Sequence, residues 1–173
     1  MRLLLVTDAW APQVNGVVVT LANTIAWLER IGYDVHVLSP EGMRTVPMPT
    51  YPDIRLSLFP GRKVRQQLEE LKPDAVHIAT EGPLGIAARR WCLRNKFPYT
   101  TSFHTQFPEY VWLRTRIPLA WCYAVMRWFH GRAAAVMVAT ATLRQRLTEH
   151  GFTNLACWSR GVDTDHFKPR PKD

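Results

Sequence analysis

Three apolar runs in this chain are each followed directly by a side chain that can take part in chemistry. The first run leads to Asp8, a later one leads to Glu81, and a third leads to His104. A histidine directly after a strand can orient or activate a hydroxyl group or stabilise developing charge, or it can simply cap the next turn. Glu81 either serves a ligand or caps the helix that begins beside it. Asp8 can cap the loop that follows its run.

The chain lacks the residue patterns that several classes of reaction require. The chain has no serine–histidine–aspartate order, no cysteine–histidine pair and no carboxylate cluster with metal-ligand spacing. We therefore expect neither a metal site nor hydrolysis through an activated nucleophile. Cys92, Cys122 and Cys157 are odd in number and far apart, which predicts buried, reduced thiols. His36 lies within a predicted strand, where we expect a structural histidine rather than a catalytic one.

A glycine turn precedes the first amphipathic segment. The continuous apolar run that begins at Arg2 predicts a buried parallel strand. A turn that ends in Asn15 and Gly16 follows it, and the run 17–31 then predicts a helix. A helix that begins behind a glycine turn presents unpaired N–H groups and partial positive charge, which suit a phosphate. The turn lacks the G-x-G-x-x-G pattern and a Walker lysine, so a plain structural turn is the alternative.

The remaining pattern alternates strands with helices. Strands are predicted at 34–39, 54–59, 75–79, 99–103, 134–138 and 155–158, and helices at 61–71, 83–95, 118–132 and 141–150. This alternation predicts an α/β fold with a parallel sheet and helices on both faces. We expect a proline-rich connection over 40–60 and a loop over 104–110. Because ligands of such sheets bind beyond the carboxyl ends of the strands, the residues of interest are Asp8, Thr80, Glu81, His104, Thr105, Arg160 and Asp163.

Length and charge narrow the class of protein. The 173 residues suit one domain, 47% of them are hydrophobic, and no apolar run approaches the length that spans a bilayer. The amino terminus lacks the pattern of a secretory signal, so we expect a cytoplasmic location. The net charge of +8 favours anionic partners such as phosphate esters or acidic lipid head groups, with ordinary solubility charge as the alternative. Without a nucleic-acid-binding motif, nucleic acid is not an expected partner.

Two basic segments suggest where an anionic partner binds. Arg62 opens the helix 61–71 together with other cations, and it either meets an anionic acceptor or belongs to a solvated helix face. The segment 112–132 combines tryptophans with arginines, as do amphipathic helices that lie in an anionic membrane interface. The alternative for this segment is a helix whose aromatic side chains fill the core.

Four motifs, in order along the chain, resemble one enzyme family. They are Val6-Thr-Asp-Ala-Trp-Ala-Pro-Gln-Val-Asn-Gly-Val17, Ala79-Thr-Glu-Gly-Pro-Leu-Gly85, Thr101-Ser-Phe-His-Thr-Gln-Phe-Pro-Glu-Tyr110 and Trp158-Ser-Arg-Gly-Val-Asp163. Together they resemble the retaining glycosyltransferases of family four, and among these the bacterial GDP-mannose-dependent mannosyltransferases. The resemblance covers the whole chain and implies a GT-B fold, in which two Rossmann-like domains face each other across a cleft.

The resemblance also implies a role for individual residues. In this family an amino-terminal domain binds mainly the acceptor, and a carboxyl-terminal domain binds the sugar nucleotide. Gly16, with Asn15, then lies against the donor diphosphate, and His104 lies at the reacting sugar. Glu81 and Thr105 match positions near the acceptor or the donor sugar. Independently of the resemblance, the basic start of the helix 61–71 makes Arg62 a candidate for binding an anionic acceptor.

The same resemblance implies how the chain is divided. Residues 1–158 correspond to the acceptor-side domain, and residues 159–173, with Arg160 and Asp163, correspond to the crossing into a donor-binding domain. The family motifs that grip the diphosphate in that second domain are absent from these 173 residues. We therefore expect this chain to be inactive alone. With that domain it should transfer a hexose, mannose from GDP-mannose, to a lipid or glycan acceptor without a cofactor or a metal.

Two other functions fit the same sequence. A sugar-nucleotide epimerase shares the two-domain fold, although the motifs at Glu81 and His104 argue against it. The chain can also be a stand-alone binding domain or one subunit of a split transferase. Tight binding of a lipid or a protein partner would mark that second alternative.

Overall fold

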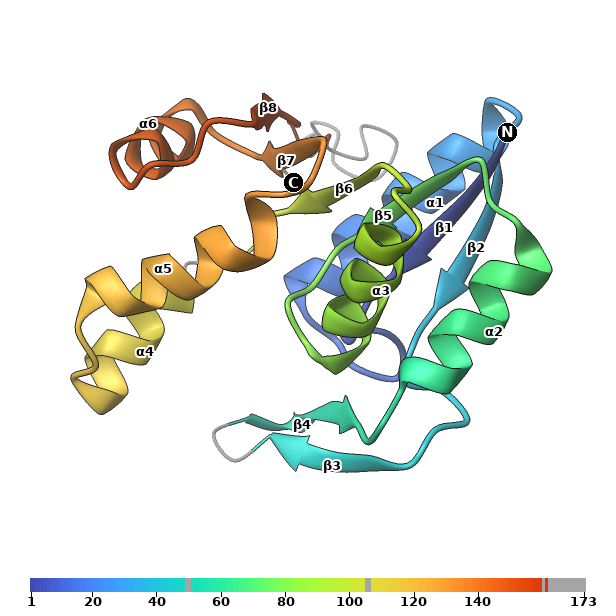
Figure 1. Cartoon of the computed structure of the whole chain (residues 1–173), viewed down its shortest axis with the longest axis horizontal. Coiled ribbons are helices and arrows are strands. Elements are labelled where there is room, and N and C mark those ends of the chain that lie inside the picture. The colour runs from blue at the N-terminus through green and yellow to red at the C-terminus, as the bar shows by residue number, and fades with distance from the viewer. Residues whose placement is uncertain (49–50, 105–106, 160, 162–173) are drawn as a thin grey trace, which may run out of the picture.

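A six-stranded parallel sheet runs through the centre of the structure, a computed structural model that describes residues 1–48, 51–104, 107–159 and 161 (Figure 1). The strand order is β2-β1-β5-β6-β7-β8, and every neighbouring pair is parallel. The strands are β1 (Arg2–Val6), β2 (Asp34–Leu38), β5 (Ala75–Ile78), β6 (Tyr99–Ser102), β7 (Ala135–Val138) and β8 (Leu155–Cys157). The predicted α/β class with a parallel sheet is confirmed.

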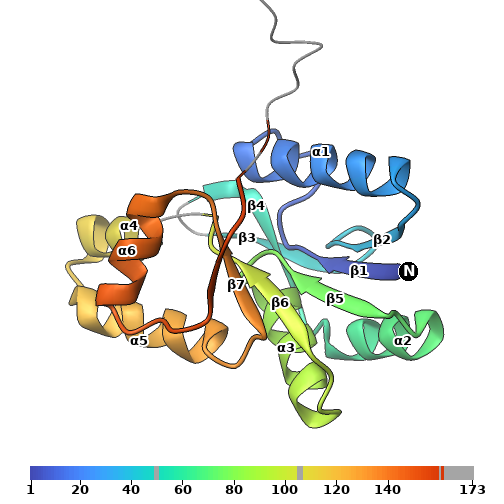
Figure 2. The same ribbon diagram turned by 90° about the horizontal axis from the view of Figure 1, so that it is seen from above.

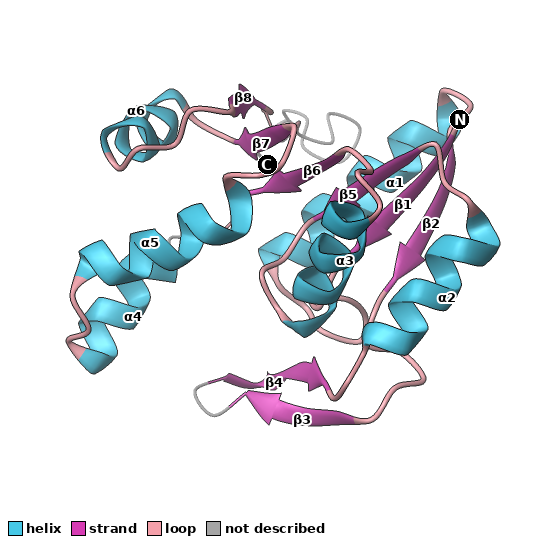
Figure 3. Ribbon diagram, viewed as in Figure 1, coloured by secondary structure: helices cyan, strands magenta, loops and turns pink. Residues whose placement is uncertain are grey.

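Helices cover both faces of this sheet (Figure 3). Figure 2 shows α1 (Gly16–Arg30) on one face, with α2 (Gly61–Leu71) and α3 (Pro83–Arg94) on the other. The connection from β1 through α1 runs toward one edge of the sheet, and the connection from β5 through α3 runs toward the other. Because such crossovers are right-handed, the two helices lie on opposite faces. The connections to β7 and β8 contain α5 (Leu119–His130) and α6 (Ala141–Glu149).

Strand β1 is buried on both sides because its alternate side chains enter two different cores. Leu4 and Val6 belong to the large cluster that also contains the buried side chains of α2 and α3. Leu5 points the other way and packs with Leu21 of α1 and with Ala79. A continuous apolar run is the pattern that a strand buried on both faces requires.

The proline-rich connection contains a hairpin of its own. β3 (Thr45–Met48) pairs antiparallel with β4 (Tyr51–Ser57), and this pair lies outside the main sheet. The sequence predicted only one strand here, at 54–59. The other strand was missed because it contains Pro47, which cannot donate a hydrogen bond to a ladder. A strand of a two-stranded sheet tolerates that loss, since one of its edges is unpaired.

The predicted loop over 104–110 is wrong in its second half, because α4 (Phe107–Thr115) begins inside it. Pro108 falls in the first turn of this helix, where a missing N–H breaks no helical hydrogen bond. The Tyr123 hydroxyl of α5 donates a hydrogen bond to the Glu109 carboxylate of α4. This hydrogen bond joins α4 to α5, a tertiary contact that the local sequence pattern does not show.

The prediction of three buried thiols is right for one cysteine only. Cys92 is fully buried in the large core, and its burial raises the pKa of the thiol to about 12. Cys122 is half-buried and Cys157 is exposed, and all three are free. The error at Cys157 has a simple cause: β8 is the last strand of the sheet and is covered on fewer sides than the central strands.

A buried carboxylate joins the end of β1 to the start of α3. Asp8 is 3% exposed, and its oxygens accept the backbone N–H groups of Leu84 at 3.0 Å and of Gly85 at 3.4 Å. The Thr80 hydroxyl donates to the same carboxylate at 3.0 Å and accepts the Asp8 backbone N–H at 2.7 Å. Asp8 therefore caps α3, whose N-cap residue, Gly82, has no side chain. The expectation that it caps the loop after its own strand is wrong.

Two glycines at the start of α3 make room for this contact. A Cβ atom on Gly82 would lie 2.4 Å from the carboxyl carbon of Asp8. A Cβ atom on Gly85 would lie 2.0 Å from the backbone oxygen of Thr80. Packing of α3 against β1 and β5 thus explains the glycines of the motif that runs from Ala79 to Gly85.

We expect Gly85→Ala to lower the free energy of unfolding by about 1–3 kcal/mol, because the added methyl group must displace the backbone at Thr80. Gly61→Ala is the matched control, since Gly61 opens α2 and a Cβ atom there meets nothing within 4 Å. That control should be neutral or slightly stabilising. Urea unfolding measures both variants, and a wild-type midpoint for Gly85→Ala would contradict the packing argument.

Asp8 should give the protein a recognisable pH dependence. Burial raises the pKa of Asp8 above its ordinary value of 3.8, in spite of the opposing hydrogen bonds from Leu84, Thr80 and Gly85. A raised pKa means that the folded state binds this proton more tightly than the unfolded state, so the stabilising contribution is lost as pH rises through the folded pKa. The stability of the wild type relative to Asp8→Asn should fall from about pH 4 toward neutrality. Urea unfolding across that range tests this, and a rising difference would refute it.

Candidate functional site

The carboxyl ends of β1 and β5 mark the point where the strand order of the sheet reverses. The chain leaves β1 toward β2 on one side and leaves β5 toward β6 on the other. Ligands of open α/β sheets bind in the crevice between two such diverging loops. Asp8 follows β1 and Glu81 follows β5, while His104 follows the neighbouring β6. The structure thus places these three predicted residues along one edge of the sheet.

Asp8 supports this edge from inside. Its carboxylate is buried and is used by the Thr80 hydroxyl and by the backbone of α3. A carboxylate with these partners fixes the position of one strand end relative to the other. Because it is buried and already hydrogen-bonded, it is not well placed to contact a ligand.

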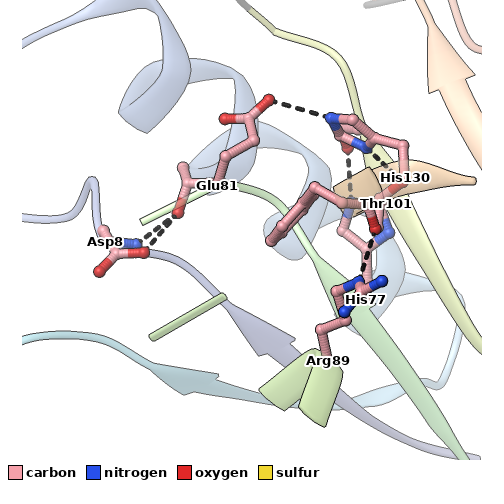
Figure 4. Close-up of polar contacts among 9 residues, drawn as sticks. Asp8, His77, Glu81, Arg89, Thr101 and His130 are labelled. Atoms are coloured by element: carbon pink, nitrogen blue, oxygen red, sulfur yellow. Dashed lines mark hydrogen bonds and ion pairs between the residues drawn. The ribbon is translucent and has the colours of Figure 1, made fainter. Parts of the chain in front are cut away.

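Glu81 pairs with a histidine that sequence reasoning did not single out. Its Oε1 atom lies 3.2 Å from Nε2 of His130, the last residue of α5, and Nδ1 of the same ring lies 2.9 Å from Oγ1 of Thr101 (Figure 4). The His130 side chain is fully buried, whereas the Glu81 side chain keeps 19% of its surface exposed. Glu81 is therefore anchored from the core and accessible at the edge. The alternative that Glu81 caps α3 is wrong, because Asp8 accepts those N–H groups.

No local signal links these two residues, since 49 positions separate them. The helical pattern around His130 predicts that one face of α5 is buried, but it does not predict what that face meets. Only the packing of α5 beside β6 brings the imidazole under Glu81.

His104 lies half-buried on the side of the sheet that α1 covers. Its ring packs edge-on against the indole of Trp158, with ring centroids 5.6 Å apart. Trp158 packs in turn against the cluster of Leu5, Leu21 and Ala79. The residue keeps part of its surface exposed, whereas the Nε2 atom of its ring is buried.

Two other histidines are structural. His77 is buried in β5, where its ring nitrogens lie 2.8 Å from Oγ1 of Thr100 and 2.6 Å from Oγ of Ser102. Burial lowers the pKa of His77 to about 4, so its ring is neutral near pH 7. His36 lies 3.0 Å from Asp34 on the exposed edge strand β2, as expected of a histidine without a catalytic role.

The start of α1 is capped and open at the same time. The Asn15 side chain accepts the backbone N–H groups of Val17 and Val18, each at 3.0 Å. Gly16 is exposed, and a Cβ atom there would meet nothing within 4 Å. Neither crowding nor a left-handed backbone requires glycine at this position, in contrast to Gly85. A ligand that approaches the backbone closely does supply a reason for it.

The other predicted site residues are not joined to this group. Arg62 is exposed in the first turn of α2, and within the described ranges no hydrogen bond or ion pair connects it to Glu81 or His104. Thr105, Arg160 and Asp163 lie outside the described residues.

Each of the two interpretations of the segment 112–132, aromatic side chains in the core or on an exposed surface, holds for part of it. Tyr123 and Phe129 of α5 are buried in the large core, as the core alternative required. Trp121, Val125 and Trp128 recur on the other face of the same helix and are 70%, 56% and 53% exposed. The protein thus presents an apolar stripe on α5 to its surroundings.

The described residues contain no group of three or more histidine, cysteine, aspartate or glutamate side chains placed to hold a metal ion. None of their helices combines the length and apolar character that crossing a bilayer requires.

Known proteins resemble this chain over about two thirds of its length or over all of it. The GDP-mannose-dependent alpha-mannosyltransferase of Mycolicibacterium smegmatis is 28% identical, over 100% of this chain and 51% of that protein. The alpha-monoglucosyldiacylglycerol synthase of Acholeplasma laidlawii is 30% identical, over 64% of this chain and 31% of that protein. The chain therefore spans about half of the length of the first relative, and its alignment with the second spans less.

A solved structure confirms the fold. The UDP-GlcNAc 2-epimerase of Methanocaldococcus jannaschii matches with a TM-score of 0.56, over 91% of this chain and 45% of that protein. At 14% sequence identity, this likeness concerns the fold alone.

The sequence profile of Glycosyltransferase Family 4 matches residues 14–166. That range begins in the turn before α1 and extends past β8, so it includes Gly16, Glu81 and His104 as well as most of the sheet. The chain belongs to Glycosyltransferase Family 4.

Proposed function

We propose that this chain is the acceptor-side half of a retaining GT-B glycosyltransferase that moves mannose from GDP-mannose to a lipid or glycan acceptor. Membership of the family supports glycosyl transfer. The name of the mycobacterial relative supports GDP-mannose as donor, and that of the Acholeplasma relative supports a diacylglycerol lipid as acceptor. Residues 1–158 form the acceptor-side domain in this proposal. Residues 159–173 begin the crossing to a donor-binding domain, with Arg160 and Asp163 at the interface.

The observation that carries the proposal is the open helix start at Gly16. A Cβ atom there meets nothing within 4 Å, so the space in front of the backbone is free for a diphosphate. The N-terminus of α1 contributes partial positive charge, and Asn15 orders the first turn. Glu81 and His104 lie beyond neighbouring strands of the same sheet edge, where the sugars of donor and acceptor meet in this proposal.

The proposed chemistry needs stabilisation of charge more than a nucleophile. In retaining transfer the bond from the sugar to the diphosphate loosens first, and charge develops on both fragments. The helix start at Gly16 stabilises the departing diphosphate, a task for which no metal is proposed, and His104 lies at the reacting sugar. Glu81, Thr105 and Arg62 bind the acceptor or the transferred sugar. The second domain supplies the remaining diphosphate contacts, so the 173 residues alone should not transfer sugar.

Gly16→Ala tests this assignment in the complete transferase. We expect its kcat/KM for GDP-mannose to fall roughly tenfold or more, because the methyl group occupies the space proposed for the diphosphate. The melting temperature should be unchanged or slightly higher, because the fold leaves that space empty. Radiolabelled mannose transfer and thermal unfolding measure the two effects. Gly61→Ala, at another open helix start, should leave transfer unchanged.

His104→Ala complements this test at the reacting sugar. Its kcat should fall about 10²-fold or more if the imidazole stabilises the transition state. Wild-type turnover by both Gly16→Ala and His104→Ala would refute the proposed site. Conversion of the sugar nucleotide to its epimer without transfer would favour an epimerase instead.

The proposed enzyme works at the cytoplasmic face of an anionic membrane. Trp121, Val125 and Trp128 form the exposed stripe on α5. Helix α4 packs against α5 and exposes large apolar side chains of its own. Figure 1 shows α4 and α5 projecting together from the sheet. Arg116 stacks on the exposed Trp112 at 5.1 Å from the ring centroid, which adds positive charge to the apolar surface. Aromatic and basic side chains together are typical of surfaces that enter an anionic interface.

Vesicle flotation tests the membrane contact. We expect the chain to float with phosphatidylcholine vesicles that contain phosphatidylglycerol, and binding should weaken roughly tenfold in the double variant Trp121→Ser/Val125→Ser. Trp27→Ser is the matched control, because Trp27 is 60% exposed on α1, away from this stripe. Flotation that ignores anionic lipid, or that survives the double variant, would remove the membrane from the proposed function.

A further inference from the structure

We propose that His130 is a positioning residue that holds the Glu81 carboxylate in place for the acceptor. This inference rests on the proposed role of Glu81 in sugar or acceptor binding and concerns a residue with no role in the chemistry described above. His130 cannot touch a ligand itself, because its side chain is fully buried. Any effect that it has on transfer must therefore pass through Glu81.

The surroundings of the His130 ring are apolar except at its two nitrogens. The rings of Phe103, Phe129 and Phe152 surround it, with centroid distances of 5.6, 4.9 and 6.3 Å. A phenylalanine would suit such a cage if the position served only to fill the core. An imidazole instead brings two polar atoms into it, and each of them needs a partner.

The partners of the two ring nitrogens determine how the proton is placed. An ionised carboxylate can only accept hydrogen bonds, so Nε2 of His130 must donate to Oε1 of Glu81. In the neutral ring Nδ1 then lacks a proton and accepts from the hydroxyl of Thr101, which is itself fully buried in β6. A directed chain of two hydrogen bonds thus runs from the central sheet through His130 to Glu81 (Figure 4).

This chain restricts a side chain that is otherwise free to rotate. The backbone of His130 is fixed as well, because its carbonyl oxygen accepts a hydrogen bond from the Asn154 amide at 3.2 Å. With Oε1 held, the partly exposed Glu81 side chain is restricted to one orientation at the edge of the sheet. Side chains that hold the ligands of a metal ion in this way typically change affinity or activity about tenfold to a hundredfold when removed, and we expect an effect of similar size here.

The experiment compares three variants of the complete transferase with diacylglycerol vesicles and GDP-mannose. His130→Phe fills the cage and removes both polar atoms, so kcat/KM for diacylglycerol should fall about tenfold or more. His130→Gln offers an amide donor toward Glu81 and an acceptor toward Thr101, and it should recover most of that loss. Thr101→Val removes the hydroxyl with little change of shape and should give an intermediate loss. Equal kcat/KM for His130→Phe and His130→Gln, with both proteins folded, would overturn the proposal.

An NMR spectrum of the histidine rings tests the hydrogen bond between His130 and Glu81 independently of activity. In the 173-residue chain, two-bond ¹H–¹⁵N correlations should show His130 as the Nε2–H tautomer, and Glu81→Leu should shift these signals. His77→Gln is the matched control: it alters another buried histidine held by two hydroxyl groups and should leave the His130 signals unchanged. An Nδ1–H tautomer, or no response to Glu81→Leu, overturns the positioning role even if transfer is intact. If the wild type transfers no sugar to diacylglycerol, the proposed acceptor fails while the spectrum still decides the contact.

Discussion

The buried carboxylate of Asp8 is the constraint on which the functional edge of this protein depends. It follows β1, accepts the backbone N–H groups at the start of α3, and accepts a hydrogen bond from the Thr80 hydroxyl just beyond β5. Burial of this carboxyl group is tolerated because several donors surround it, and their loss would leave it without hydrogen-bond partners. These contacts set the two loops of the switch point relative to each other. Glu81 lies one residue beyond Thr80 and inherits its position from them.

Glycine serves two opposite purposes along this edge. At Gly82 and Gly85 the absent Cβ atom lets helix α3 approach Asp8 and the backbone of Thr80. At Gly16 the absent Cβ atom leaves open space in front of a helix start, although no contact within the fold requires that space. The first pair therefore serves stability, and the open position is available for a ligand. Replacing glycine is therefore expected to disturb packing at Gly82 and Gly85 and access to the helix start at Gly16.

Helix α5 contributes to two surfaces at once. Its buried face carries Tyr123 and Phe129 into the core and ends in His130, which reaches Glu81. Its outer face presents Trp121 and Val125 to the surroundings. In the proposed enzyme, a helix that rests on a membrane thus also holds a carboxylate at the acceptor site. Binding to the lipid surface and the order of that site are then mechanically connected through one rigid element.

The sequence alone determined the α/β class, the parallel strands and the residues that follow them, because period and strand-end position are local properties. Asn15 and Gly16 were also readable as a helix start for the same reason. Local patterns did not predict helix α4 or the hairpin strand with Pro47, since tertiary contacts and an unpaired edge make those segments stable. They misassigned the cap of α3, which comes from Asp8, 76 positions before Leu84. Only the tertiary structure decided that Glu81 meets His130, because no periodicity along the chain encodes which buried face a distant carboxylate will contact.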